Sequence, residues 1–198
     1  MQNFTYKAQE ALQRASHTAS ERGHQQVDVI HLFLALLGQE QSVVTAVLQR
    51  LNVPIRDLQR RIEGELNLLP AVRMAPSGGV GQIFVTPELK ATLDRAAEEA
   101  KKLKDEYIST EHFLLAVLEV RSPIRVLLNE LQIDREKVLK VLSEVRGHQR
   151  VDSPEPESTY QALEKYSVNL TAQAREGKLD AFDGMKPGIH QRGVMDGM

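Results

Sequence analysis

The string HLFLALL at residues 31–37 returns almost unchanged as HFLLAVL at residues 112–118. In both places a histidine is followed by six consecutive apolar residues. The flanking residues also match, at a separation of 81 before the strings and 80 after them: Thr5 with Thr86, Leu12 with Leu93, Ala19 with Ala100, and Leu48 with Leu128. A repeat of this length predicts two copies of one supersecondary unit, in which each copy covers the apolar face of the other.

The two apolar strings are predicted to be buried helices. A helix that is apolar on every side needs cover on every side, and residues 32–37 and 113–118 have no polar face. Asp28 is a suitable N-cap for the first helix, and Ser109 or Thr110 for the second. We expect the stability of the domain to depend on these two helices.

Helical spacing of apolar residues continues on both sides of each string. It predicts six further helices, over residues 4–23, 42–51, 54–69, 86–103, 123–131 and 134–147. The predicted fold is therefore all-α, with eight helices arranged as two four-helix repeats, about 4–69 and about 85–147, related by a pseudo-twofold axis. The connector 70–84 contains two prolines and three glycines and has no helical period, and residues 80–85 are a candidate short strand.

The double repeat is predicted to form one domain over residues 1–147. Residues 148–180 are predicted to be a linker with one helix, because polar, proline-containing sequence precedes a helical apolar pattern over 160–174. Residues 181–198 hold four glycines and three of the five methionines of the chain and lack an apolar period. This atypical tail is predicted to be disordered.

Composition excludes several classes of function. The 25 basic and 27 acidic residues are interspersed, which disfavours nucleic acid as a partner. The chain has no cysteines, so disulfides and thiolate metal sites are excluded and a reducing compartment, the cytoplasm, is expected. The longest apolar run, six residues, is far shorter than the roughly 20 residues that cross a bilayer, so no membrane role is expected.

No catalytic, metal or cofactor site is predicted. None of the six histidines lies in an HExxH arrangement, and GGVGQ at 78–82 lacks the lysine and hydroxyl residue of a phosphate-binding loop. No serine lies in a nucleophile-elbow motif. His31 and His112, at the starts of the two buried helices, are expected to bond to the backbone or to a neighbouring turn. These observations favour a helical interaction module.

The duplicated helix, together with ISTEHFLLAVL at 108–118, resembles the N-terminal domain of the Clp unfoldase family. Three further stretches resemble the disaggregase branch of that family: LNLLP at 66–70, VTPELKATL at 85–93, and STYQALEKYSVNLTAQAREGKLD at 158–180. The resemblance covers residues 1–180 and includes the linker into the first ATPase module. The sequence AFDGMKPGIHQRGVMDGM that follows resembles nothing in the family, and we interpret it as a foreign or frame-shifted end after a truncation. ATP hydrolysis and ring assembly are therefore not expected of this chain, which is expected to be a monomer and not an enzyme.

The resemblance also implies a function in polypeptide binding. In the family this domain helps to capture unfolded or aggregated polypeptides for threading by a hexameric ATPase ring, and the implicated residues map onto Thr5, Asp105 and Glu111. Thr5 and Glu111 also have a structural interpretation, as the cap of the first helix and as a first-turn carboxylate of the sixth. Because the first copy has Ile30 where the second has Glu111, we expect the polar contacts in the second copy, together with Thr5.

The expected mechanism is weak binding of extended apolar segments in a groove between the copies, rimmed by these polar groups. Weak binding suits a tethered module, which acts through its high effective concentration and must release its cargo. Two alternatives remain. An adaptor-docking module would bind a defined folded partner, and a small helical enzyme is least favoured because the chain lacks a catalytic constellation.

Overall fold

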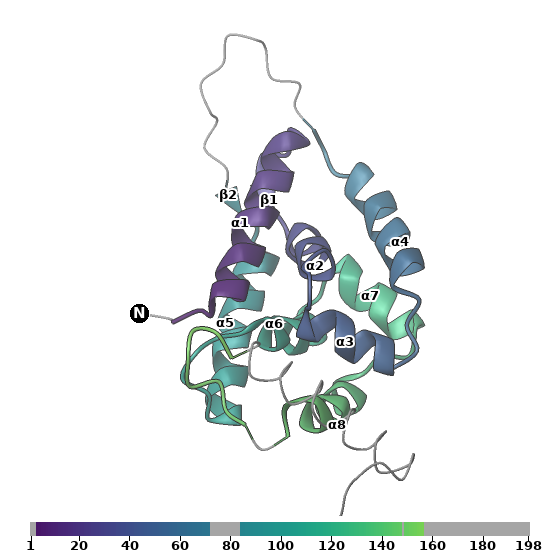
Figure 1. Cartoon of the computed structure of the whole chain (residues 1–198). Helices are drawn as coiled ribbons and strands as arrows, with labels where there is room; N and C mark the ends of the chain where they lie inside the picture. The colour runs from purple at the N-terminus through teal and green to yellow at the C-terminus, as the bar shows by residue number, and fades with distance from the viewer. Residues whose placement is uncertain (1–2, 72–83, 148, 157–198) are drawn as a thin grey trace, which may run out of the picture. The chain divides into compact units, whose positions relative to one another are not determined.

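The computed structural model describes residues 3–71, 84–147 and 149–156 (Figure 1). In these ranges the first copy contains α1 (Tyr6–Glu21), α2 (Val29–Leu37), α3 (Val43–Arg50) and α4 (Ile55–Asn67), and the second contains α5 (Pro87–Leu103), α6 (Thr110–Val117), α7 (Pro123–Glu130) and α8 (Arg135–Arg146). The predicted all-α fold of two four-helix repeats is confirmed. The predicted helix at 160–174 and the predicted disordered tail lie outside the described residues.

The two central helices are covered as the apolar strings predicted. Every residue of α6 is buried, and every residue of α2 is buried except Leu34, which is partly exposed. The matched residue of the second copy, Leu115, is completely buried. The two copies therefore share one plan but do not bury their central helices equally.

Matched residues begin matched helices. The Thr5 hydroxyl accepts the N–H of Ala8 at 3.2 Å at the start of α1, and the Thr86 hydroxyl accepts the N–H of Leu89 at 3.2 Å at the start of α5. The predicted caps at 28 and 109 are confirmed. Pro54, predicted to lie in the first turn of α4, is its N-cap instead, since the helix begins one residue later.

Short strands join the copies reciprocally. β1 (Gln26–Val27) pairs in parallel with β2 (Phe84–Val85), and Phe4 forms the matched parallel bridge with Ile108. The segment before the first helix of each copy thus pairs with the segment before the buried helix of the other. The later helices also pack between the copies, α3 on α8 and α4 on α7. The candidate strand at 80–85 is confirmed at its last two residues, and the others lie outside the described ranges.

Residues 149–156, here called the strap, return from the end of α8 across the second copy. Val151 in the strap is completely buried. Its carbonyl oxygen accepts the N–H groups of Glu106 at 3.0 Å and Tyr107 at 3.2 Å, and the carbonyl oxygen of Pro154 accepts the N–H of Tyr6 at 2.9 Å. The part of the predicted linker that the structure describes is therefore packed against the double repeat. The domain limits drawn from the sequence stay a prediction.

Across the described helices, none has both the length and the apolar character that a bilayer span requires.

Candidate functional site

Thr5 lies at the junction of the two copies. Its side chain is completely buried and caps α1, and its backbone N–H donates to the carbonyl oxygen of Ile108 at 3.0 Å. Ile108 begins the short approach to α6, which carries Glu111 in its first turn. The structural role expected for Thr5 as a helix cap is confirmed, and the same residue also fixes the turn that leads to α6.

Asp105 is the hub of a buried polar cluster. Arg146 on α8 donates through Nη2 to both carboxylate oxygens, at 2.7 and 2.8 Å, and the backbone N–H of Val151 donates to Oδ1 at 2.8 Å. The side chain of Asp105 is completely buried. Burial alone would raise the pKa of this carboxyl, but hydrogen bonds from His112, the Val151 N–H and Arg146 outweigh it and lower the pKa.

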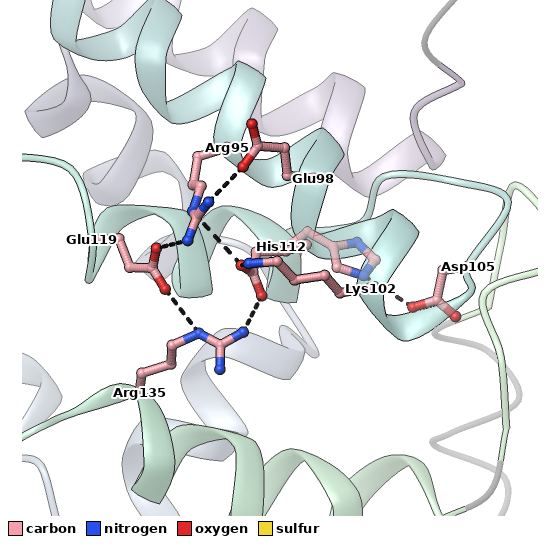
Figure 2. A network of polar contacts seen from close by, with 8 residues as sticks. Arg95, Glu98, Lys102, Asp105, His112, Glu119 and Arg135 are labelled. Carbon is pink, nitrogen blue, oxygen red and sulfur yellow. Dashed lines mark hydrogen bonds and ion pairs between the residues drawn. The ribbon is translucent and has the colours of Figure 1, made fainter.

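His112 connects Asp105 to the start of α6 (Figure 2). Its Nδ1 accepts the backbone N–H of Ser109 at 2.9 Å, so in the neutral ring Nε2 carries the hydrogen. Nε2 lies 2.9 Å from Oδ2 of Asp105 and donates to it. In the first copy, Nδ1 of His31 accepts the N–H of Asp28 at 3.0 Å in the same way. The expectation that both histidines bond to the backbone is confirmed.

The two capping histidines have different partners at matched positions. Asp105 of the second copy corresponds, at the separation of 81, to His24 of the first. Nε2 of His31 lies 2.8 Å from Nδ1 of His24. Burial lowers the pKa of His31 to about 4, with a further contribution from His24, and burial also lowers the pKa of His24. The first copy therefore carries a neutral pair where the second carries a carboxylate.

Glu111 lies beside the same cluster and is completely buried. Its Oε1 is 3.8 Å from Nε of Arg146. Among the described residues, neither carboxylate oxygen of Glu111 accepts a hydrogen bond. Arg146 thus lies against Glu111 and Asp105 together, and the structure brings the three predicted residues to one turn. Their side chains are buried, so they do not form an exposed rim.

A hollow of about 240 Å³ lies next to this cluster. Its walls come from the end of α5, from α8 and from the strap: Leu103, Leu139, Leu142, Ser143, Arg146, Gly147, Gln149 and Arg150. The hollow is within the second copy.

Sequence reasoning missed Arg146 and Val151 as partners of the site. The available signal for Arg146 was its place four residues after the buried Leu142, on the apolar side of α8.

A third buried carboxylate, Glu99 on α5, was also missed. Arg135 donates to it at 2.5 Å and Lys102 at 2.7 Å. Arg135 and Arg95 also pair with Glu119, and Figure 2 shows how these side chains converge between α5 and α8. Burial would raise the pKa of Glu99, but the bonds from Lys102 and Arg135 lower it. Three cations, Arg95, Lys102 and Arg135, pair with three carboxylates, Glu98, Glu99 and Glu119, so the charges of this cluster balance and it serves to join the helices.

In the ranges that the structure describes, no three His, Asp or Glu side chains are arranged to hold a metal ion.

Comparison with known proteins agrees with this architecture. Residues 3–131 match the family described as the Clp repeat (R) N-terminal domain. The chain is 41% identical over 184 residues to the chaperone protein ClpB of Bacillus cereus, covering 93% of this chain and 21% of that protein. It is 44% identical over 185 residues to ClpB of Nitratidesulfovibrio vulgaris, covering 91% of this chain and 21% of that protein.

Solved structures share the fold. The Hsp104 N-terminal domain from Candida albicans superposes with a TM-score of 0.67 at 23% identity, covering 79% of this chain and 99% of that one. The N-terminal domain of the ClpV1 ATPase from E. coli gives a TM-score of 0.62 at 19% identity, covering 76% and 90%. The chain belongs to the Clp N-terminal domain family. It spans about a fifth of the length of the curated relatives that it matches.

Proposed function

We propose that this chain is an accessory polypeptide-binding domain of a protein disaggregase, which captures unfolded or aggregated proteins for threading by an ATPase ring. One observation carries the proposal: similarity to chaperones named ClpB extends over more than nine tenths of the chain. The convergence of Thr5, Asp105 and Glu111 on one turn supports it, because the residues that the family resemblance implicates lie together although they come from both copies.

The partners proposed for the domain follow from the same relationship. They are unfolded or aggregated polypeptides and, in a longer protein, the ATPase modules and the hexamer that these modules form. The chain itself is proposed to act as a monomer in the cytoplasm, without catalytic activity or a cofactor. Binding is proposed to be weak, so that a captured segment passes on to the ring.

Thr5, Asp105 and Glu111 are buried, and they are proposed to act by holding the surface residues above them in place. Asp105 and Glu111 hold Arg146 between them, and Asp105 also holds Val151 of the strap. Their substitution is therefore expected to change the surface above them as well as the charge. An isosteric change is the sharper test, because truncation to alanine would leave Arg146 without its anions in a buried place.

The test is a titration of a fluorescently labelled, permanently unfolded protein, followed by anisotropy. Asp105→Asn and Glu111→Gln are expected to weaken binding several-fold while the far-UV circular dichroism spectrum stays that of the wild type. Glu144→Gln, which neutralises an exposed acid on α8, is the control and is expected to bind as the wild type does.

Two results would count against the proposal. If the wild type does not bind the unfolded protein, polypeptide capture is wrong and the adaptor-docking alternative remains. If Asp105→Asn and Glu111→Gln bind with unchanged affinity while correctly folded, the two residues have no part in the site.

A further inference from the structure

The strap is held in the way that proteins hold an extended peptide. Both main-chain groups of Val151 are bonded: its N–H donates to Asp105, and its carbonyl oxygen accepts from Glu106 and Tyr107. Further along, the carbonyl oxygen of Pro154 accepts from Tyr6. Main-chain bonds combined with pockets for single side chains are the usual means of binding an extended segment of variable sequence.

Only some side chains of the strap are buried against the domain. Val151 and Pro156 are buried, whereas Arg150, Asp152 and Glu155 are exposed. A surface that takes two apolar side chains and otherwise bonds to the main chain places few demands on sequence. An unfolded protein offers such segments in large number, because its main chain is not engaged in secondary structure.

The first copy provides an internal comparison. After α4 the chain also returns, and Ala71 forms an antiparallel bridge with His24. These residues match Val151 and Asp105 at separations of 80 and 81. In the second copy the position of His24 is taken by a carboxylate, which accepts a main-chain N–H through a charged oxygen. Such bonds are stronger than those between neutral groups.

We propose that the strap is an intramolecular ligand, and that an extended segment of an unfolded polypeptide binds in its place. The incoming segment donates a main-chain N–H to Asp105, accepts from Glu106 and Tyr107, and inserts an apolar side chain where Val151 lies. This inference rests on the proposed function and assigns a location to it. It gives the buried carboxylate of Asp105 a direct role, since displacement of the strap uncovers it.

The roles of the other two predicted residues follow from the same geometry. Thr5 caps α1, and the residue after it, Tyr6, donates its N–H to the carbonyl oxygen of Pro154 in the strap. Oε1 of Glu111 is 3.8 Å from Nε of Arg146. Arg146 in turn donates to the Asp105 carboxylate and fixes its orientation. Both are positioning residues for the groove under the strap, while Asp105 contacts the bound segment.

A reversible disulfide crosslink between the strap and the start of α1 tests the inference. The chain has no cysteine, so the double variant Tyr6→Cys, Pro154→Cys forms a single disulfide, between residues whose backbones are already joined by a 2.9 Å bond. In the oxidised protein the strap cannot leave, and binding of the labelled unfolded protein is expected to be lost. Reduction is expected to restore it. Equal binding by the oxidised and reduced forms would overturn the inference.

A second variant works in the opposite direction. Val151→Pro removes the N–H that bonds to Asp105 but keeps an apolar side chain, and Arg146 still satisfies the carboxylate. Loss of a hydrogen bond to a charged group is expected to release the strap and tighten the binding of unfolded protein by roughly tenfold. Asp152→Asn, a change at the next, exposed residue, is the control. Unchanged or weaker binding by Val151→Pro would contradict the inference.

The two proposals fail differently. If no form of the protein binds unfolded polypeptide, polypeptide capture itself is wrong. If every form binds, and neither the disulfide nor the proline changes the affinity, capture stands and its location under the strap is wrong.

Discussion

Replacement of His31 by glutamine is expected to make the domain more resistant to acid. His31 is completely buried in the first turn of α2, where its Nδ1 accepts the N–H of the cap residue Asp28. Glutamine and glutamate commonly fill this place in a capping box, because their side chains also reach back to that N–H. His31→Gln therefore keeps an acceptor for the helix start and removes a group that titrates.

The magnitude follows from the pKa of His31. Burial, aided by His24, lowers it to about 4 from the ordinary value of 6.5. Between these two pKa values the unfolded chain binds a proton at His31 and the folded chain does not. The stability that the neutral ring contributes is therefore complete above pH 6.5 and is lost as the pH falls toward 4. Between about pH 7 and pH 4.5 the loss is about 2 kcal/mol, out of a total of about 5–15 kcal/mol.

The pH window separates His31 from the buried acids. The pKa values of Asp105 and Glu99 are both lowered in the folded protein. Their stabilisation is complete above the ordinary pKa of each carboxyl and is lost as the pH falls through the lowered value. Most of that loss lies below pH 4.5, and what remains is common to the wild type and His31→Gln. The difference between these two proteins therefore reports on the histidine.

The assay is urea unfolding followed by far-UV circular dichroism at about pH 7 and pH 4.5. The wild type is expected to lose about 2 kcal/mol more of its free energy of unfolding than His31→Gln over this interval. His17→Gln, a change at an exposed histidine on α1, controls for the loss of a histidine as such. If His31→Gln lost as much stability as the wild type, the assignment of acid sensitivity to this buried ring would be refuted.

Three further stability predictions use the same urea assay at neutral pH. Leu115→Ala is expected to cost about 3 kcal/mol and Leu34→Ala clearly less, because only Leu115 is completely buried; equal losses would contradict this. Lys104 has a φ of 60° where the first copy has a glycine, so Lys104→Gly is expected to raise stability by about 0.5–1 kcal/mol, and a decrease would show that the left-handed turn is not strained. Arg135→Ala removes a partner of the buried Glu99 and is expected to cost about 2 kcal/mol, whereas an unchanged midpoint would mean that Lys102 and Arg95 neutralise Glu99 without Arg135.

The helices could be predicted from the sequence because their signals are local. Asp28 and Thr86 each cap a helix through a hydrogen bond to a residue two or three positions later. Apolar residues at helical spacing identify the face that packs, and the repeat supports each assignment twice. Pro54 was misplaced by one position because a proline with its fixed φ suits either the cap or the first turn.

The polar site could be predicted only in part, because its contacts are not local. Asp105 bonds to residues 41 and 46 positions later, in α8 and in the strap. The family resemblance pointed to Asp105 as a candidate, but nothing near it in the sequence indicates Arg146 or Val151 as its partners. The partial exposure of Leu34 has the same cause, since cover of a helix depends on which distant helices reach it.

The difference between His24 and Asp105 explains why one fold gives two unequal copies. A neutral imidazole can be buried with one hydrogen-bond partner, and His31 supplies it. A buried carboxylate needs charge and several donors, so Asp105 requires Arg146 and the main chain of the strap in addition to His112. A single changed position in the repeat therefore ties α8 and the strap to the turn before α6. In the first copy the segment after α4 meets the same turn through the bridge of Ala71 with His24, and the neutral His24 needs no charged partner there.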